Sequence, residues 1–286
     1  MGDRVQKFVG QAAMLCAVAL VTACSTARND RTWEPYLSHT THVEVSPAHF
    51  AVAPVTDWTY TAQAPVTQNY VDASYDIADL RRIWFVLEPQ PGSTLAAHTF
   101  LLFEFPNDRL LGVTIEARRE LGEKYSAVRG VFNAFELAYV WGTARDLLTR
   151  RAVLLNHDVF MYPTTPTDSM KEAILTHLLE STSSLEHHPR FYNTLTSNCT
   201  NELAKATQLQ WHYSFILTGK SDDHLYELGF IPGPSFEEAH RRSDISAFVR
   251  QLNEHGGETD AAFDHALLTE LRRRSAPDQS AALGAR

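Results

Sequence analysis

The sequence predicts an α+β domain, because strand-like segments dominate its first half, helix-like segments follow, and no regular strand–helix alternation is present. Residues 98–105 (HTFLLFEF) are apolar on both faces, which is typical of a central strand. A Pro-Asn-Asp-Arg turn signal separates them from residues 110–116 (LLGVTIE), so the two segments are expected to form a hairpin. Residues 168–180 have apolar side chains at helical spacing.

The remaining elements divide the chain into a main domain and two flanking segments. Residues 24–75 are rich in Thr, Ala, Pro and Ser and predict a tether followed by a loosely structured or edge segment. The main domain is expected over 76–245, and C-terminal helices with a frayed tail over 246–286. Further strands are predicted at 82–87, 139–140, 147–155 and 159–162, and further helices at 202–208, 245–252 and 261–274.

The first 23 residues have the order of a secretory signal peptide: a short basic region, a mostly apolar run over residues 8–21, and small residues at a cleavage point. The apolar run is too short to span a bilayer comfortably. Val21-Thr22-Ala23-Cys24 resembles the lipobox of bacterial lipoproteins. That resemblance implies cleavage before Cys24 and acylation of Cys24, with fatty acids such as palmitate. The alternative is an ordinary signal peptide with an accidental cysteine.

The N-terminus and the charge together indicate a compartment and exclude some partners. Ser25, rather than Asp, follows Cys24, which by analogy favours the periplasmic face of the outer membrane. The chain has a net charge of −9, and loss of residues 1–23 would make it about −10. Such a charge argues against nucleic acid or an anionic membrane surface as an electrostatic partner, so the expected membrane contact is the lipid on Cys24.

Cys199 is the residue best placed to carry chemistry. Cys16 would leave with the signal peptide and Cys24 would be lipidated, so Cys199 would be the only free thiol in an oxidising compartment. It stands at the predicted start of a helix, with Asn198 or Ser197 as N-cap, where free amides and the helix dipole lower the pKa of a thiol. The alternative is a buried cysteine that packs as a small hydrophobe.

His98 is the candidate base, because it opens an apolar strand directly after a Pro/Gly loop. The alternative is a core histidine that bonds to a neighbouring carbonyl. A base needs an orienting partner, and the register of the hairpin decides which residue faces His98. A two-residue turn pairs His98 with Ala117, and a three-residue turn pairs it with Glu116. Glu104 lies too far along the strand to be the orienting partner.

Other catalytic signatures are absent from the sequence. It contains no HExxH, CxxC or GxSxG motif and no glycine-rich phosphate loop. The histidine clusters lack the spacing of metal ligands, so neither a metal nor a cofactor is expected.

Four sequence blocks occur in the order found in one protein family: HTFLLFEF, VTIEARRE-x-GE-x-YS, ELAYV and FYNTLTSNCT. Together they resemble the periplasmic N-terminal domain of the bacterial lipoprotein intramolecular transacylase, over about residues 80–215. The resemblance implies a permuted papain-like (NlpC/P60-like) domain, with an antiparallel sheet packed on the helix that bears the cysteine. It also implies acyl transfer through a cysteine and a histidine, which map onto Cys199 and His98. Unlike the transacylase, this chain has no membrane-spanning helices after the domain.

The expected function is therefore acyl transfer or hydrolysis of a lipid, lipoprotein or peptide in the cell envelope. Glu116 would orient His98, and the helix start at Asn198 and Thr200 would cap the helix or donate to the oxyanion. Arg118 and Arg119 could bind a carboxylate or phosphate of the substrate. The alternatives are a peptidoglycan-directed amidase or peptidase and a non-catalytic envelope-binding lipoprotein.

Overall fold

Strand β5 (Ala97–Phe105) runs through the middle of a sheet that is covered on both faces, as its two-sided apolar pattern predicts. In the computed structural model, which describes residues 26–207, 209–255 and 259–275, alternate side chains of β5 enter two different cores. Leu101 and Phe103 pack in one core, and Phe100 and Leu102 pack in the other.

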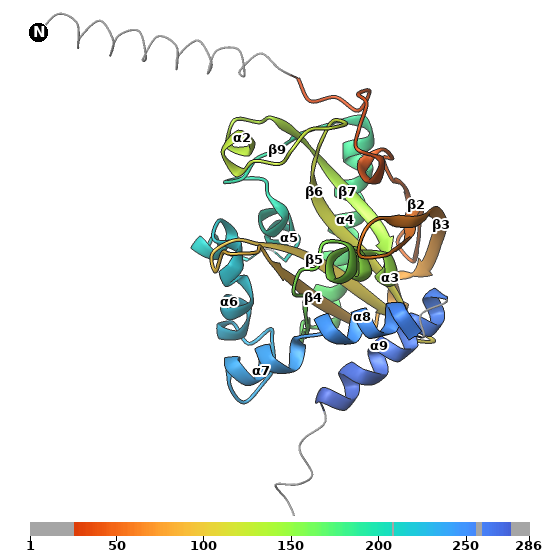
Figure 1. The fold of residues 1–286 in the computed structure, drawn as a ribbon, viewed down its shortest axis with the longest axis vertical. Coiled ribbons are helices and arrows are strands. Elements are labelled where there is room, and N and C mark those ends of the chain that lie inside the picture. The colour runs from red at the N-terminus through yellow and green to blue at the C-terminus, as the bar shows by residue number, and fades with distance from the viewer. Residues whose placement is uncertain (1–25, 208, 256–258, 276–286) are drawn as a thin grey trace, which may run out of the picture.

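The sheet has nine strands in the part of the chain that the structure describes. Nearly all pairs of neighbouring strands are antiparallel. Their order is β1-β2-β7-β6-β5-β4-β8, with β3 paired to β2 and β9 to β7; only β2 and β7 pair in parallel (Figure 1). The other bounds are β1 (His42–Val45), β2 (His49–Tyr60), β3 (Pro65–Asp76), β4 (Arg82–Pro89), β6 (Arg109–Arg118), β7 (Phe135–Thr143), β8 (Phe160–Pro163) and β9 (Phe191–Tyr192).

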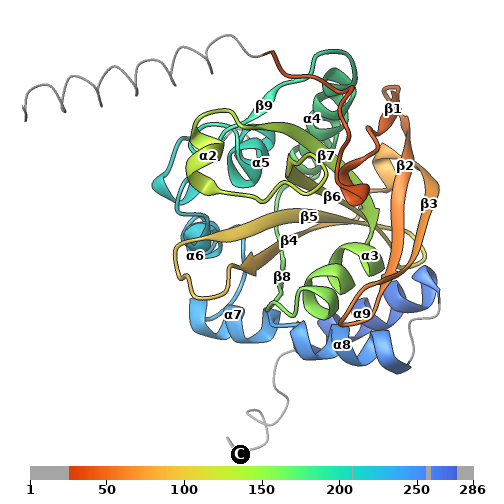
Figure 2. The same ribbon diagram turned by 45° about the horizontal axis from the view of Figure 1, so that its top comes forward.

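Helices cover both faces of this sheet, and each group closes one core (Figure 2). α4 and α5 contribute to the core that contains Leu101, whereas α3, α8 and α9 contribute to the core that contains Phe100. The helices of the described residues are α2 (Ala127–Val131), α3 (Ala144–Thr149), α4 (Asp168–His187), α5 (Cys199–Thr207), α6 (Ser221–Glu227), α7 (Phe236–Ser243), α8 (Ser246–His255) and α9 (Asp260–Ser275). The predicted α+β class is confirmed. No helix among the described residues is long and apolar enough to cross a membrane.

The register of the β5–β6 hairpin is the one that a three-residue turn predicts. Phe105 pairs with Arg109 and Phe100 with Thr114. The turn residues Asn107 and Asp108 have φ angles of 61° and 56°, which places both in the left-handed region that Asn and Asp tolerate best among side-chain-bearing residues. The same register, continued to the strand end, places His98 beside Glu116 rather than Ala117.

Two predictions of local structure are wrong. The segment 147–155 is not a strand: α3 begins after the N-cap Thr143 and continues into a π-helical turn over Arg150–Leu154. Its apolar run is buried on the sheet, and periodicity does not separate a short buried helix from a buried strand. The irregular segment expected before residue 76 instead contains β1, β2 and β3. Pro54 lies where the β2–β3 register shifts, which is where a strand accommodates proline.

The predicted signal peptide and lipid-bearing Cys24 lie outside the described residues, as does the end of the predicted tail after residue 275. The C-terminal helices, in contrast, form as expected. They pack against the same sheet as the main domain, so they extend its layers.

Candidate active site

Cys199 is the first residue of α5, and the turn before it is fixed by Asn198. The Asn198 Oδ1 accepts the Asn201 amide at 2.8 Å, so Asn198 is the N-cap of the helix, as predicted. Its side-chain nitrogen donates to the carbonyls of Thr194 and Phe215, each at 2.8 Å. Both amide hydrogens of Asn198 are therefore occupied, and the side chain acts as a cap rather than as an oxyanion donor.

The thiol of Cys199 and the imidazole of His98 line the same cavity, and each shifts the pKa of the other, although about a hundred residues separate them in the sequence. His98 lies at the start of β5, and Cys199 packs in the core between β5 and α5. The structure thus brings together the two residues that the sequence analysis singled out. Cys199 is the free cysteine of the described residues, and it is buried.

The far side of the His98 ring is held by Thr114 and Glu116 on β6. The His98 Nε2 lies 2.6 Å from the Thr114 hydroxyl and 3.3 Å from a Glu116 oxygen. The Thr114 hydroxyl donates its only proton to Glu116 at 2.9 Å, so it can only accept from His98. Nε2 therefore carries a proton, and Nδ1 is the ring nitrogen left for the thiol. Glu116 occupies the orienting position that the three-residue turn predicts.

A buried arginine, Arg151, links this group to a second carboxylate. Its guanidinium approaches Glu116 at 3.1 Å and Glu88 at 3.0 Å, and it donates to Thr114 at 3.1 Å. Glu88 also bonds to His157. Arg151 is not among the predicted site residues, because the sequence predicts a strand over 147–155. Glu88 is not among them either, because no motif distinguishes the end of the strand predicted over 82–87. In the β4–β5 register, however, Glu88 is the direct partner of His98.

The charges around the thiol favour a thiolate–imidazolium pair. Burial alone would lower the pKa of His98, but the Glu116 carboxylate and the Cys199 thiolate outweigh it and raise that pKa to about 10. Burial would raise the pKa of the Cys199 thiol, but the charge and hydrogen bond of His98, together with hydrogen bonds from Thr99, lower it to about 7. Glu116 stays ionised, because His98 and Arg151 hold its pKa well below the usual range despite burial.

The thiol and imidazole open onto a cavity of about 480 Å³. Charged groups of the site lie in its wall, including Glu88, Glu116 and Arg151. Large apolar side chains that are partly exposed also line it: Leu95, Tyr125, Leu155 and Leu217. A cavity of this size, with polar groups converging on a reactive side chain, is typical of a small-molecule site.

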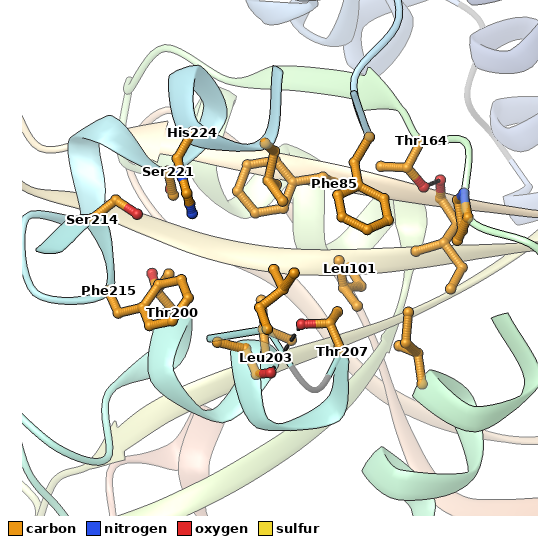
Figure 3. A pocket seen from close by; sticks show the side chains of 17 residues that line it. Phe85, Leu101, Thr164, Thr200, Leu203, Thr207, Ser214, Phe215, Ser221 and His224 are labelled. Atoms are coloured by element: carbon orange, nitrogen blue, oxygen red, sulfur yellow. Dashed lines mark hydrogen bonds between the residues drawn. The ribbon is translucent and has the colours of Figure 1, made fainter. Parts of the chain in front are cut away.

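A second, smaller pocket lies next to Thr200, Leu203 and Phe215 and is lined mainly by apolar side chains from β4, α5 and α6 (Figure 3). The Thr200 side chain faces this pocket, and its hydroxyl bonds to Thr99 at 2.9 Å. Any oxyanion donor at Thr200 is therefore its backbone amide. That amide and the amide of Cys199 belong to the first helical turn, where no earlier carbonyl of the helix can accept them.

The two arginines predicted to bind substrate have different surroundings. Arg118 is buried and does not line the cavity that holds Cys199; it donates to Asn29, Thr40 and the carbonyls of Leu37 and Ser38, and it stacks on Trp33. The donors of Arg118 fix the N-terminal segment on the sheet, and a role of Arg118 in substrate binding stays a prediction. Arg119, the residue that follows the end of β6, lines the cavity. Within the described ranges, no cluster of side chains could hold a metal ion.

Comparison with known proteins places this geometry in a family. Residues 66–219 match the family described as the Lnb N-terminal periplasmic domain. The chain belongs to this family. The Lnb match spans β3 to the turn after Phe215 and so contains both Cys199 and His98. Searches of curated proteins and of solved structures found no match. The predicted periplasmic N-terminal domain is thus confirmed at the level of the family.

Proposed function

We propose that this Lnb-family chain is a cysteine-dependent acyltransferase or hydrolase of the bacterial cell envelope, with Cys199 as nucleophile and His98 as proton carrier. The observation that carries the proposal is that Cys199 and His98 line one cavity, with His98 held by Thr114 and Glu116 and with the pKa of the Cys199 thiol lowered to about 7 beside the imidazole. We also propose that Cys24 carries lipid at the periplasmic face of the outer membrane. A permuted papain-like arrangement, histidine on a strand and cysteine on a later helix, is the corresponding fold proposal.

The chemistry follows from the protonation state of the pair. The thiolate attacks an acyl carbonyl, and the amides of Cys199 and Thr200 can donate to the oxyanion at the helix start. His98 gives its proton to the leaving oxygen or nitrogen, and a thioester forms on Cys199. Neutral His98 then takes a proton from an incoming amine or water, which attacks the thioester and releases the thiolate. Glu116 and Thr114 keep the ring oriented through both steps.

Two observations favour an acyl ester over the alternatives. The partly exposed apolar side chains at the cavity suit an acyl chain. The low pKa of the Cys199 thiol beside His98 supports an enzyme rather than a binding protein with an inert thiol. A peptidoglycan-directed amidase or peptidase would use the same pair, so the choice between ester and amide needs an experiment.

The test is to trap the thioester. Incubation with p-nitrophenyl octanoate should add one octanoyl group to Cys199, seen by intact mass and peptide mapping, and Cys199→Ser and His98→Gln should abolish it. Muropeptides should show no cleavage under the same conditions. Absence of the adduct with rapid muropeptide cleavage would replace this proposal by the peptidase alternative, and absence of both activities would reject an enzyme of either kind.

The lipid anchor has a separate test. Cys24→Ser should leave an uncleaved precursor without lipid in a bacterial host that processes lipoproteins, whereas Cys199→Ser should leave processing intact. A wild-type protein that is exported with an uncut N-terminus would contradict the anchor but would not affect the thiol site.

A further inference from the structure

The wall of the catalytic cavity carries more positive than negative charge, although the chain as a whole is acidic. Its cations are three arginines and His98, and its anions are two carboxylates and the Cys199 thiolate. Arg151 and His98 are bound to those anions. The remaining cations are Arg119 and Arg150, and with them the wall has four cations against three anions, an excess of one positive charge.

Arg119 and Arg150 come from different elements but adjoin the same short segment. The carbonyl of Arg119 accepts the amide of Glu34, and the guanidinium of Arg150 lies 4.2 Å from the ring centre of Tyr36. Both side chains line the cavity and are only partly buried. Within the part of the chain that the structure describes, neither forms a salt bridge with a carboxylate, Glu34 included. The charge of Arg119 acts on Glu116 without a direct ion pair, and two half-buried guanidinium groups that form no salt bridge are suited to an anionic ligand.

The ligand must also suit the rest of the cavity. Partly exposed Leu95, Leu155 and Leu217 offer apolar surface to an acyl chain, whereas the arginines offer charge to a headgroup. Between them the thiolate needs an acyl carbonyl. A molecule that carries an acyl chain, an ester and a nearby anion in this order is a glycerophospholipid, in which the phosphodiester is attached to the acylated glycerol.

We propose that Arg119 and Arg150 bind the phosphodiester of a glycerophospholipid that serves as the acyl donor. This inference rests on the proposed function. In the reaction, the bond between the sulfur and the acyl carbonyl carbon forms, and the bond between that carbon and the glyceryl oxygen breaks. His98 gives its proton to the released glyceryl oxygen, and a lysophospholipid leaves with the acyl group remaining on Cys199.

The experiment compares two soluble donors that differ in the headgroup: dioctanoyl phosphatidylglycerol and dioctanoylglycerol. Octanoylation of Cys199 is followed by intact mass. The wild-type protein should be acylated at least about tenfold faster by the phospholipid, which corresponds to about 1.4 kcal/mol. Arg119→Gln/Arg150→Gln should bring this ratio close to one. Arg81→Gln, which removes an exposed arginine outside the cavity, should keep the ratio.

Binding separates failure of this inference from failure of the proposed function. In Cys199→Ala protein, calorimetric titration should show at least about tenfold tighter binding of the phospholipid than of the diacylglycerol, and the double arginine variant should lose that difference. Equal binding of the two lipids, or a preference that survives in the double variant, would overturn the anion site whatever the thiol does. A preference in binding without any acylation would keep the anion site and reject the thiol chemistry.

Discussion

Arg118 and Arg151 are almost equally buried, at 3% and 2% exposed, but their partners shift their pKa values in opposite directions. Arg118 donates to uncharged oxygens and stacks on Trp33, so its charge has little nearby compensation. Burial lowers its pKa to about 10, and only Glu136 opposes this effect. Arg151 lies between Glu88 and Glu116, and these carboxylates raise its pKa although burial acts in the opposite direction.

The comparison shows that burial of a charge does not by itself indicate an active site. Arg118 uses a cation to hold the backbone of an N-terminal segment. Arg151 uses the same group to keep Glu116 ionised, and Glu116 in turn supports the charge of His98 beside the thiol. The difference between the two arginines is that the partners of Arg151 are titratable carboxylates, whereas the hydrogen-bond acceptors of Arg118 are uncharged. The following substitutions test that distinction.

The largest effect is expected from Arg151→Met. The substitution leaves Glu88 and Glu116 buried without their cation, so we expect the free energy of unfolding to fall by about 3–5 kcal/mol. Urea unfolding with a circular-dichroism readout measures it. A loss below about 1 kcal/mol would mean that the two carboxylates are compensated by other groups.

Arg118→Met should cost less, about 1–3 kcal/mol, because the acceptors that it leaves are neutral. The pH dependence of Cys199 alkylation should stay that of the wild type, since Arg118 does not line the cavity that holds Cys199. Both readouts come from the same preparation. A loss larger than that of Arg151→Met, or a displaced thiol titration, would remove the contrast between the two arginines.

Glu116→Gln should have the smallest energetic effect of the three and a specific signature. It removes the carboxylate that holds the pKa of His98 high, so His98 loses its proton at lower pH and favours the thiolate less. We expect the thiol pKa to rise by about one unit, which corresponds to about 1.4 kcal/mol. Glu120→Gln, at a surface ion pair with Arg31, serves as the control and should cause no change. An unchanged thiol pKa in Glu116→Gln would leave Thr114 as the orienting group.

Much of the fold followed from local patterns in the sequence. The two-sided apolar run of β5 and the helical spacing of α4 were sufficient to place both elements. The sequence left two registers of the hairpin open, and the three-residue turn of the structure selects the one that places His98 beside Glu116. The segment 147–155 was misassigned because a buried helix and a buried strand share a composition. β2 and β3 were missed because proline and threonine are also typical of linkers.

The sequence predicts those residues of the candidate site whose residue type is rare or typical of a helix start. It does not predict the residues that only the packing of distant segments brings to the site. Cys199 is the only cysteine after the N-terminal region, and Asn198 precedes it as a common N-cap residue. Glu88, Arg151 and Thr114 come from three different elements, and no local spacing connects them. The two candidate substrate arginines are adjacent in the sequence, yet only Arg119 lines the cavity. Arg118 is the last residue of β6 and Arg119 follows it, and composition does not show which of two such neighbours faces a cavity.

The central claim is that His98 makes the Cys199 thiol ionise near neutral pH, and the alkylation rate of Cys199 against pH tests it most directly. The rate should be followed at the Cys199 peptide by mass spectrometry. We predict an inflection at about 7 in the wild type. In His98→Gln the inflection should move to about 8.5 or higher, the range of a free cysteine, because burial then acts without the opposing imidazolium. A wild-type inflection at or above about 8.5, or one that His98→Gln leaves in place, would contradict the account.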